Sequence, residues 1–113
     1  MSGERTPGGV VDLLGPTGTG PVWGMASDEL NATLLAWPPG HEVIEEMPSA
    51  LDVLLIVLEG GATAKVGGQE HALVPGSALL LERGHTRLIR AGTEGVRYLS
   101  VHRRRGPLQL GDR

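Results

Sequence analysis

The sequence contains no cysteine and no phenylalanine, and its aromatic residues are two tryptophans and one tyrosine. Without cysteine the chain can form neither a disulfide nor a thiolate metal site, which fits a cytoplasmic location. Without phenylalanine the hydrophobic core must be built mainly from Leu, Val, Ile and Ala. The 113 residues are enough for one domain with one such core.

The sequence also lacks a strong charge and a long hydrophobic run. Its net charge is −3 at pH 7, and a small charge of mixed sign produces no field that would attract nucleic acid or an anionic membrane. The longest strongly apolar run, residues 53–58, is far too short to cross a bilayer. No apolar segment follows basic residues near the N-terminus. We therefore expect a cytoplasmic protein with no nucleic-acid partner and no membrane partner.

Glycine and proline are abundant instead, with 18 and 8 copies. Many of them lie in residues 1–21, where their density excludes a helix or a central strand. We therefore expect a flexible N-terminal arm over 1–21 and a single domain over 22–113. The apolar residues 10–14 interrupt the arm and could dock as an edge strand, either on this domain or on a partner chain.

From residue 22 onward, short apolar runs alternate with glycine or proline turns, which is typical of an all-β sandwich or barrel. The run 53–58 has no polar face, so a strand there must be covered on both sides. A second subunit would supply the outer cover, and we expect a homodimer; a buried helix fits the β-branched residues and flanking glycines less well. The predicted strands are 22–26, 30–37, 43–47, 53–58, 62–66, 70–73, 77–81, 86–90 and 96–102.

The glycine frame resembles the two conserved motifs of the cupin superfamily. Gly40 and Gly60 stand at the separation of the glycines that bound the first motif, and Gly76 and Gly84 match the second. The resemblance covers residues 30–102 and implies a jelly-roll β-barrel of short antiparallel strands. It also implies four metal-ligand positions, which in this chain fall on Glu46, Pro48, Val53 and Arg87.

These four residues do not form the ligand set that the resemblance would require. Glu46 alone could bind a cation, because Pro48 and Val53 have no side-chain donor atoms and Arg87 carries a fixed positive charge. Moving the frame by one residue offers Glu45, Met47 and Asp52, a set that still lacks any imidazole. We therefore expect no metal and no other cofactor.

If the frame is correct, Glu46 and Arg87 face one another in the barrel and form an ion pair where relatives hold a metal. The alternative is that both side chains are separately solvated at the barrel mouth. His85 could share the inward face of Arg87, and His102 has the strand parity of Tyr98. Together with Trp37, whose indole supplies an apolar wall, these residues are the candidate ligand-binding set.

Three functions remain open at this point. The first is a metal-free barrel that binds a small organic molecule, with Glu46 and Arg87 fixing its polar end. The second is a metal-independent isomerase, epimerase or cyclase that uses Glu46 or His85 as acid or base and Arg87 to stabilise negative charge. The third, a metal-dependent dioxygenase, conflicts with the replaced ligand positions. The fold alone does not choose among them.

Overall fold

The chain folds into antiparallel β-strands, as expected from the spacing of its turns. A computed structural model describes residues 9–45 and 49–104, and no helix occurs within these ranges, so none there could cross a membrane. The all-β prediction is confirmed. The strands are β1 (Gly20–Ala26), β2 (Leu30–Trp37), β3 (Glu42–Glu45), β4 (Val53–Val66), β5 (Gln69–Leu73), β6 (Ala78–Leu81) and β7 (Arg87–Arg103).

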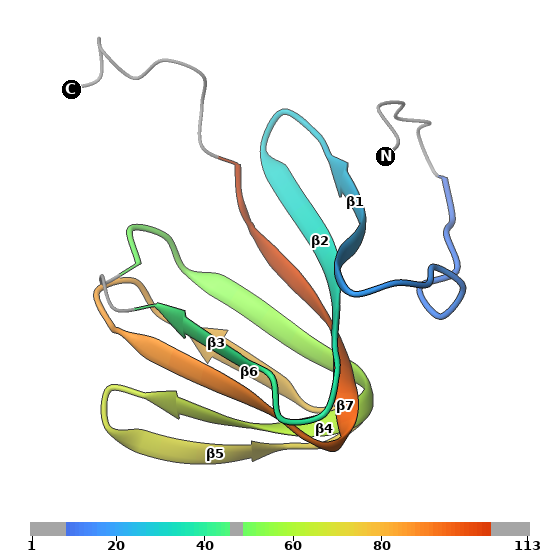
Figure 1. Ribbon diagram of the computed structural model, residues 1–113. Helices are drawn as coiled ribbons and strands as arrows, with labels where there is room; N and C mark the ends of the chain where they lie inside the picture. Colours follow the sequence, from blue (N-terminus) through green and yellow to red (C-terminus); the bar gives the residue numbers. More distant parts are fainter. Residues whose placement is uncertain (1–8, 46–48, 105–113) are drawn as a thin grey trace, which may run out of the picture.

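Two long strands, β4 and β7, each take part in two sheets. The first half of β4 and the second half of β7 lie in a sheet of order β1-β2-β7-β4-β6, and their other halves lie in a sheet of order β3-β7-β4-β5. Figure 1 shows β1 and β2 standing apart from β3 and β5, while β4 and β7 turn from one group to the other. The space between the two sheets is therefore the interior of the fold.

The bend in β4 and β7 corrects the sequence prediction of nine strands. Residues 53–58 and 62–66 form one strand, and so do residues 86–90 and 96–102, apart from Thr86, which precedes β7. Gly60 and Gly95 both have positive φ, and a Cβ on Gly60 would overlap the carbonyl oxygen of Gly95. These glycines thus bend two paired strands together, whereas the sequence analysis treated glycine as a chain reversal.

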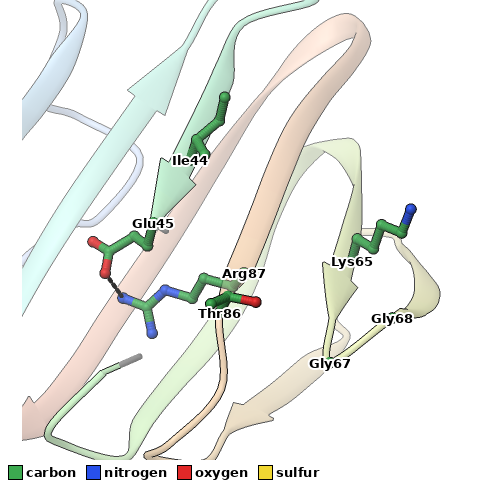
Figure 2. A pocket seen from close by; sticks show the side chains of 7 residues that line it. All are labelled: Ile44, Glu45, Lys65, Gly67, Gly68, Thr86 and Arg87. Carbon is green, nitrogen blue, oxygen red and sulfur yellow. Dashed lines mark ion pairs between the residues drawn. The ribbon is translucent and has the colours of Figure 1, made fainter. Parts of the chain in front are cut away.

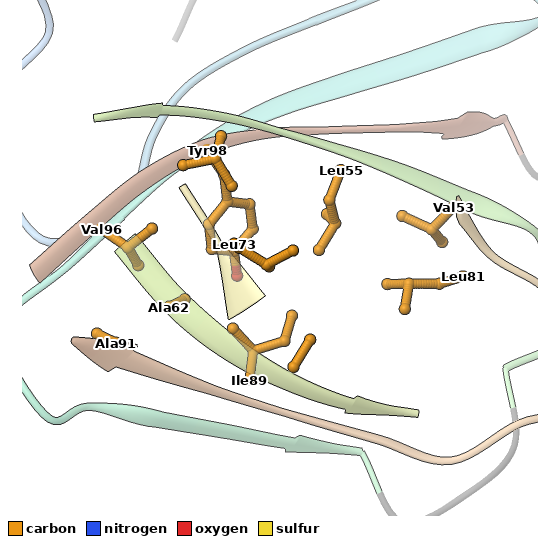
Figure 3. Close-up of a cluster of buried hydrophobic side chains, with 11 residues drawn as sticks. Val53, Leu55, Ala62, Leu73, Leu81, Ile89, Ala91, Val96 and Tyr98 are labelled. Carbon is orange, nitrogen blue, oxygen red and sulfur yellow. The ribbon is translucent and has the colours of Figure 1, made fainter. Parts of the chain in front are cut away.

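The interior is filled by aliphatic side chains together with one tyrosine (Figure 3). Along β4 the buried residues alternate with more exposed ones, so that Val53, Leu55 and Val57 point inward. Such alternation is the signature of a sheet with one face on the core. The core cluster comprises Val53, Leu55, Val57, Ala62, Ala64, Leu73, Leu81, Ile89, Ala91, Val96 and Tyr98.

The outer face of the first sheet is also apolar. Cross-strand neighbours on this face form two rows that run across β1, β2, β7, β4 and β6, and neither row contains a charged residue. Leu80 on β6 is 56% exposed. We call these two rows the outer apolar face; they are Trp23, Leu34, Leu99, Ile56 and Ala78, and Met25, Ala32, Val101, Leu54 and Leu80.

Part of the N-terminal segment contacts β7. The guanidinium Nη1 of Arg97 donates hydrogen bonds to the carbonyl oxygens of Leu13 and Pro16, at 3.3 and 2.9 Å. Residues 9–19 contain no strand, and β1 begins at Gly20. The flexibility of the arm over 1–21 stays a prediction.

Candidate functional site

Arg87 and Glu45 form an ion pair where β3 meets β7. The two residues are direct cross-strand partners in this antiparallel pair, so their side chains leave the same face of the sheet. Arg87 Nη2 lies 3.6 Å from Glu45 Oε1, and the two side chains are 16% and 44% exposed. Figure 2 shows both side chains extending to one side of the sheet, while Lys65 points to the other. Arg87 is therefore a largely buried cation whose counter-ion remains accessible to water.

The carboxylate beside Arg87 comes one position earlier than the motif frame predicts. Glu46 lies outside the described residues, as does Pro48, so the pairing of Glu46 with Arg87 stays a prediction. The apolar residues Val43 and Ile44 are adjacent, and this part of the sequence therefore gives no alternation that would identify the inward face. The pairing of β3 with β7 decides it, because Val43 packs against the core and Glu45 has the same parity.

One nitrogen of Arg87 has no partner. Nη1 is buried and makes no hydrogen bond within the described part of the chain, and the ion pair with Glu45 involves Nη2. A buried donor without an acceptor costs free energy, on the order of 1–3 kcal/mol and more for a charged group. Such a group is typical of a site that binds an acceptor from outside the chain.

Tyr98 lies on the inner face of β7 and is hydrogen-bonded to Trp37 on β2. The indole Nε1 of Trp37 donates to the Tyr98 hydroxyl at 3.1 Å. Burial raises the pKa of Tyr98; the Trp37 hydrogen bond and the charge of Arg87 lower this pKa, and the charge of Glu45 raises it. Tyr98 is therefore within electrostatic reach of the ion pair, and Trp37 contacts Tyr98 directly; that these residues bind a ligand stays a prediction.

His41 stacks on the face of the Trp37 indole, a contact that the sequence did not predict. The two rings are stacked with their centroids 4.1 Å apart and their planes 4° from parallel. Because the indole is fixed by this stacking and by its bond to Tyr98, its orientation at the site is set in advance.

The remaining candidate histidines are not part of this group. His85 is exposed and lies by the β4–β5 turn, with its Nδ1 3.2 Å from the position of a Cβ on Gly67. His102 shares the inner face of β7, but four residues of strand separate it from Tyr98, a distance of roughly 13 Å. Its ring contacts Asn31 and the carbonyl of Arg103 instead.

The described residues do not fit a metal ion. Val53 is buried in the core without any donor atom, and Arg87 brings a positive charge to the interior. Within residues 9–45 and 49–104, no three of the histidine, aspartate and glutamate side chains gather as a ligand group.

An open depression of about 350 Å³ lies at this end of β3 and β7. Its volume is in the range of small-molecule sites. Arg87 and Glu45 are both in its wall, and Figure 2 shows how they lie relative to the other lining residues. The lining consists of Ile44, Glu45, Lys65, Gly67, Gly68, Thr86 and Arg87.

Comparison with known proteins identifies the architecture. No protein-family model and no curated protein sequence matches the chain. Solved structures do match: a protein from Thermus thermophilus has a TM-score of 0.71 and 24% identity over 83% of this chain and 95% of its own. A cupin superfamily protein from Desulfitobacterium hafniense has a TM-score of 0.62 and 26% identity over 70% and 71% of the two chains.

A third match comes from a eukaryote. The cupin domain of Schizosaccharomyces pombe Cnp3 has a TM-score of 0.67 and 17% identity, covering 74% of this chain and 63% of that one. Its low identity means that it supports the fold and nothing about function. The strand architecture, the glycine frame and these structural neighbours agree that this chain is a small cupin-type protein with the jelly-roll fold.

Proposed function

We propose that this protein is a metal-free cupin that binds a small organic molecule beside Arg87. The observation that carries the proposal is the buried, unpartnered Nη1 of Arg87, on the residue that the motif frame assigns to a metal ligand. A fixed cation there repels a metal ion and attracts a ligand with hydrogen-bond acceptors. The aliphatic core and the Trp37 indole supply an apolar surface for the rest of the molecule.

A metal-independent isomerase, epimerase or cyclase remains the second candidate. It would require an acid or base beside Arg87, and among the described residues Glu45 is the carboxylate in that position. Tyr98 could supply a proton as well, since its hydroxyl accepts from Trp37. His85 lies by the β4–β5 turn, which makes it a less suitable base than Glu45.

Two measurements on the purified full chain test the binding proposal. Native mass spectrometry should detect a retained organic molecule, and elemental analysis should find no stoichiometric iron, manganese, nickel or zinc. Arg87→Met should release the molecule, whereas Arg90→Met should retain it. Arg90 is a matched control because it lies on the same strand and also pairs with a β3 carboxylate, that of Glu42, at an exposed position. One equivalent of metal per chain would overturn the proposal.

We also propose that two copies associate through the outer apolar face. Each copy presents the same two uncharged rows, so a two-fold arrangement covers both faces at once without opposing charges. Leu34 is fully buried, so the face offers nine at least partly exposed side chains per copy, fewer than the roughly 20–30 residues of a standard interface. The dimer should therefore dissociate on dilution.

A further inference from the structure

The interior beside β7 contains two hydrogen-bond donors without acceptors. The first is Nη1 of Arg87, which is buried and has no partner in the described part of the chain. The second is the hydroxyl proton of Tyr98: its oxygen accepts from Trp37, and within the same ranges no bond uses its proton. Donors left over in one region predict a ligand that brings acceptors and few donors.

Glu45 does not fill this role. Its oxygen lies 3.6 Å from the other terminal nitrogen of Arg87, beyond normal hydrogen-bond length, and its side chain is 44% exposed. A carboxylate in this position reduces the net charge of the site but leaves Nη1 and the Tyr98 proton free. It can also turn toward water when a stronger acceptor arrives, because it has little burial to lose.

From these donors we propose that the bound molecule is a monocarboxylate, whose carboxylate accepts from Arg87 Nη1 and from the Tyr98 hydroxyl. This inference rests on the proposed binding function and specifies its ligand class. A planar carboxylate has two acceptor oxygens that suit a guanidinium. A phosphate dianion suits the site less well, because Glu45 already opposes the charge of Arg87 and would repel a second negative charge.

The neighbouring side chains indicate the rest of the ligand. Leu35, Trp37 and Val43 are partly buried hydrophobic residues that pack against the core. The Trp37 ring is held in place by His41 and Tyr98. These apolar groups favour an aromatic or short aliphatic body behind the carboxylate.

Matched probes of one shape and different charge provide the test. The full-length protein is titrated with benzoate, benzamide, hexanoate, hexanamide and inorganic phosphate, and binding is followed by calorimetry. Tyr98 is the single tyrosine, so its absorbance reports binding at the site. At least one acid should bind roughly tenfold or more tighter than its amide, as expected for a charge-assisted hydrogen bond. That acid should also raise the pKa of Tyr98, because it accepts the phenolic proton.

Variants assign the effect to the two donors. Arg87→Met should remove the preference for the acid, and Tyr98→Phe should weaken acid binding by about tenfold. Arg90→Met should leave both unchanged. If Arg87→Met does not fold, Arg87→Lys replaces it in the test. Lysine keeps the positive charge but has one terminal nitrogen in place of two, so this variant should bind the acid more weakly than the wild type.

The other possible results of these titrations contradict either the carboxylate inference or the proposed binding function. If an amide binds as tightly as its acid, or phosphate binds more tightly than both acids, binding stands and the carboxylate inference is wrong. If Arg87→Met and Arg87→Lys bind the acid like the wild type, the carboxylate does not lie at Arg87. If none of the probes binds and native mass spectrometry finds no retained molecule, the proposed function fails together with the inference.

Discussion

Trp37 and Tyr98 lie on neighbouring strands and are joined by a hydrogen bond of 3.1 Å from the indole nitrogen to the phenol oxygen. The bond leaves the Tyr98 proton available to another acceptor and holds the ring in a core otherwise made of aliphatic side chains. Because the tyrosine is 4% exposed and is the only one in the chain, its ionisation reports directly on the charges beside it.

The pKa of Tyr98 should respond to both members of the ion pair in opposite directions. Arg87 lowers this pKa and Glu45 raises it, so Arg87→Met should raise it and Glu45→Gln should lower it. Absorbance near the phenolate band measures each shift. Arg90→Met serves as the control and should leave the value unchanged. Equal pKa values in all four proteins would show that the pair does not face Tyr98.

Stability should fall as the pH rises above 10. Burial raises the folded-state pKa of Tyr98 above its ordinary value of 10.0, so in this range the unfolded chain releases a proton that the folded chain keeps. The stabilisation is therefore complete below pH 10 and is lost as the pH rises through the folded-state pKa. Urea unfolding of the wild type and Tyr98→Phe measures the difference, and parallel pH profiles would contradict the prediction.

Arg87→Met should leave the free energy of unfolding unchanged or raise it by about 1 kcal/mol, because it removes a buried nitrogen that has no partner among the described residues. A double-mutant cycle of Arg87→Met with Glu45→Gln should give a coupling free energy of about 1 kcal/mol or less, since Glu45 is 44% exposed. The exposed pair Glu42 and Arg90 is the control cycle. A loss above roughly 3 kcal/mol in Arg87→Met would mean that Arg87 has a strong internal partner.

The same cycle with Glu46→Gln tests the pair that the sequence predicted. Coupling to Arg87→Met clearly above about 0.5 kcal/mol would identify Glu46 as a further partner. Additive effects would reject the pairing.

Leu80→Glu should convert the proposed dimer to a monomer, because it places a charge within the outer apolar face. Val74→Glu is the matched control: the two side chains are 56% and 58% exposed, and Val74 lies in the loop after β5. Light scattering coupled to size exclusion at several concentrations measures the masses. A wild-type monomer at the highest concentration would contradict the proposed association.

Gly60→Ala should lower the free energy of unfolding far more than Gly68→Ala. Both glycines have positive φ, 73° and 87°, so both substitutions carry a backbone penalty of about 1–2 kcal/mol. Only at Gly60 would the new Cβ collide with a backbone carbonyl, that of Gly95, whereas no atom lies within 4 Å at Gly68. We expect a cost above about 4 kcal/mol at Gly60, measured by urea unfolding; equal costs would show that the bend can relax.

The sequence by itself determined the all-β class and the glycine frame, because these depend on the spacing of short apolar runs and on residues with special backbone freedom. Local alternation does not say whether Gly60 reverses a strand or bends it, since both need positive φ. The pairing of β4 with β7 on both sides of Gly60 decides this.

Only the tertiary structure decided that Glu45 accompanies Arg87. Glu45 and Glu46 are adjacent in the sequence, and in a strand a shift of one residue exchanges the two faces. The choice depends on the register of β3 against a strand that is more than forty residues away in the sequence, where Glu45 is paired with Arg87. The same long-range packing leaves Nη1 of Arg87 without a partner in the described part of the chain, because burial and hydrogen-bond geometry depend on side chains that meet only in the folded chain.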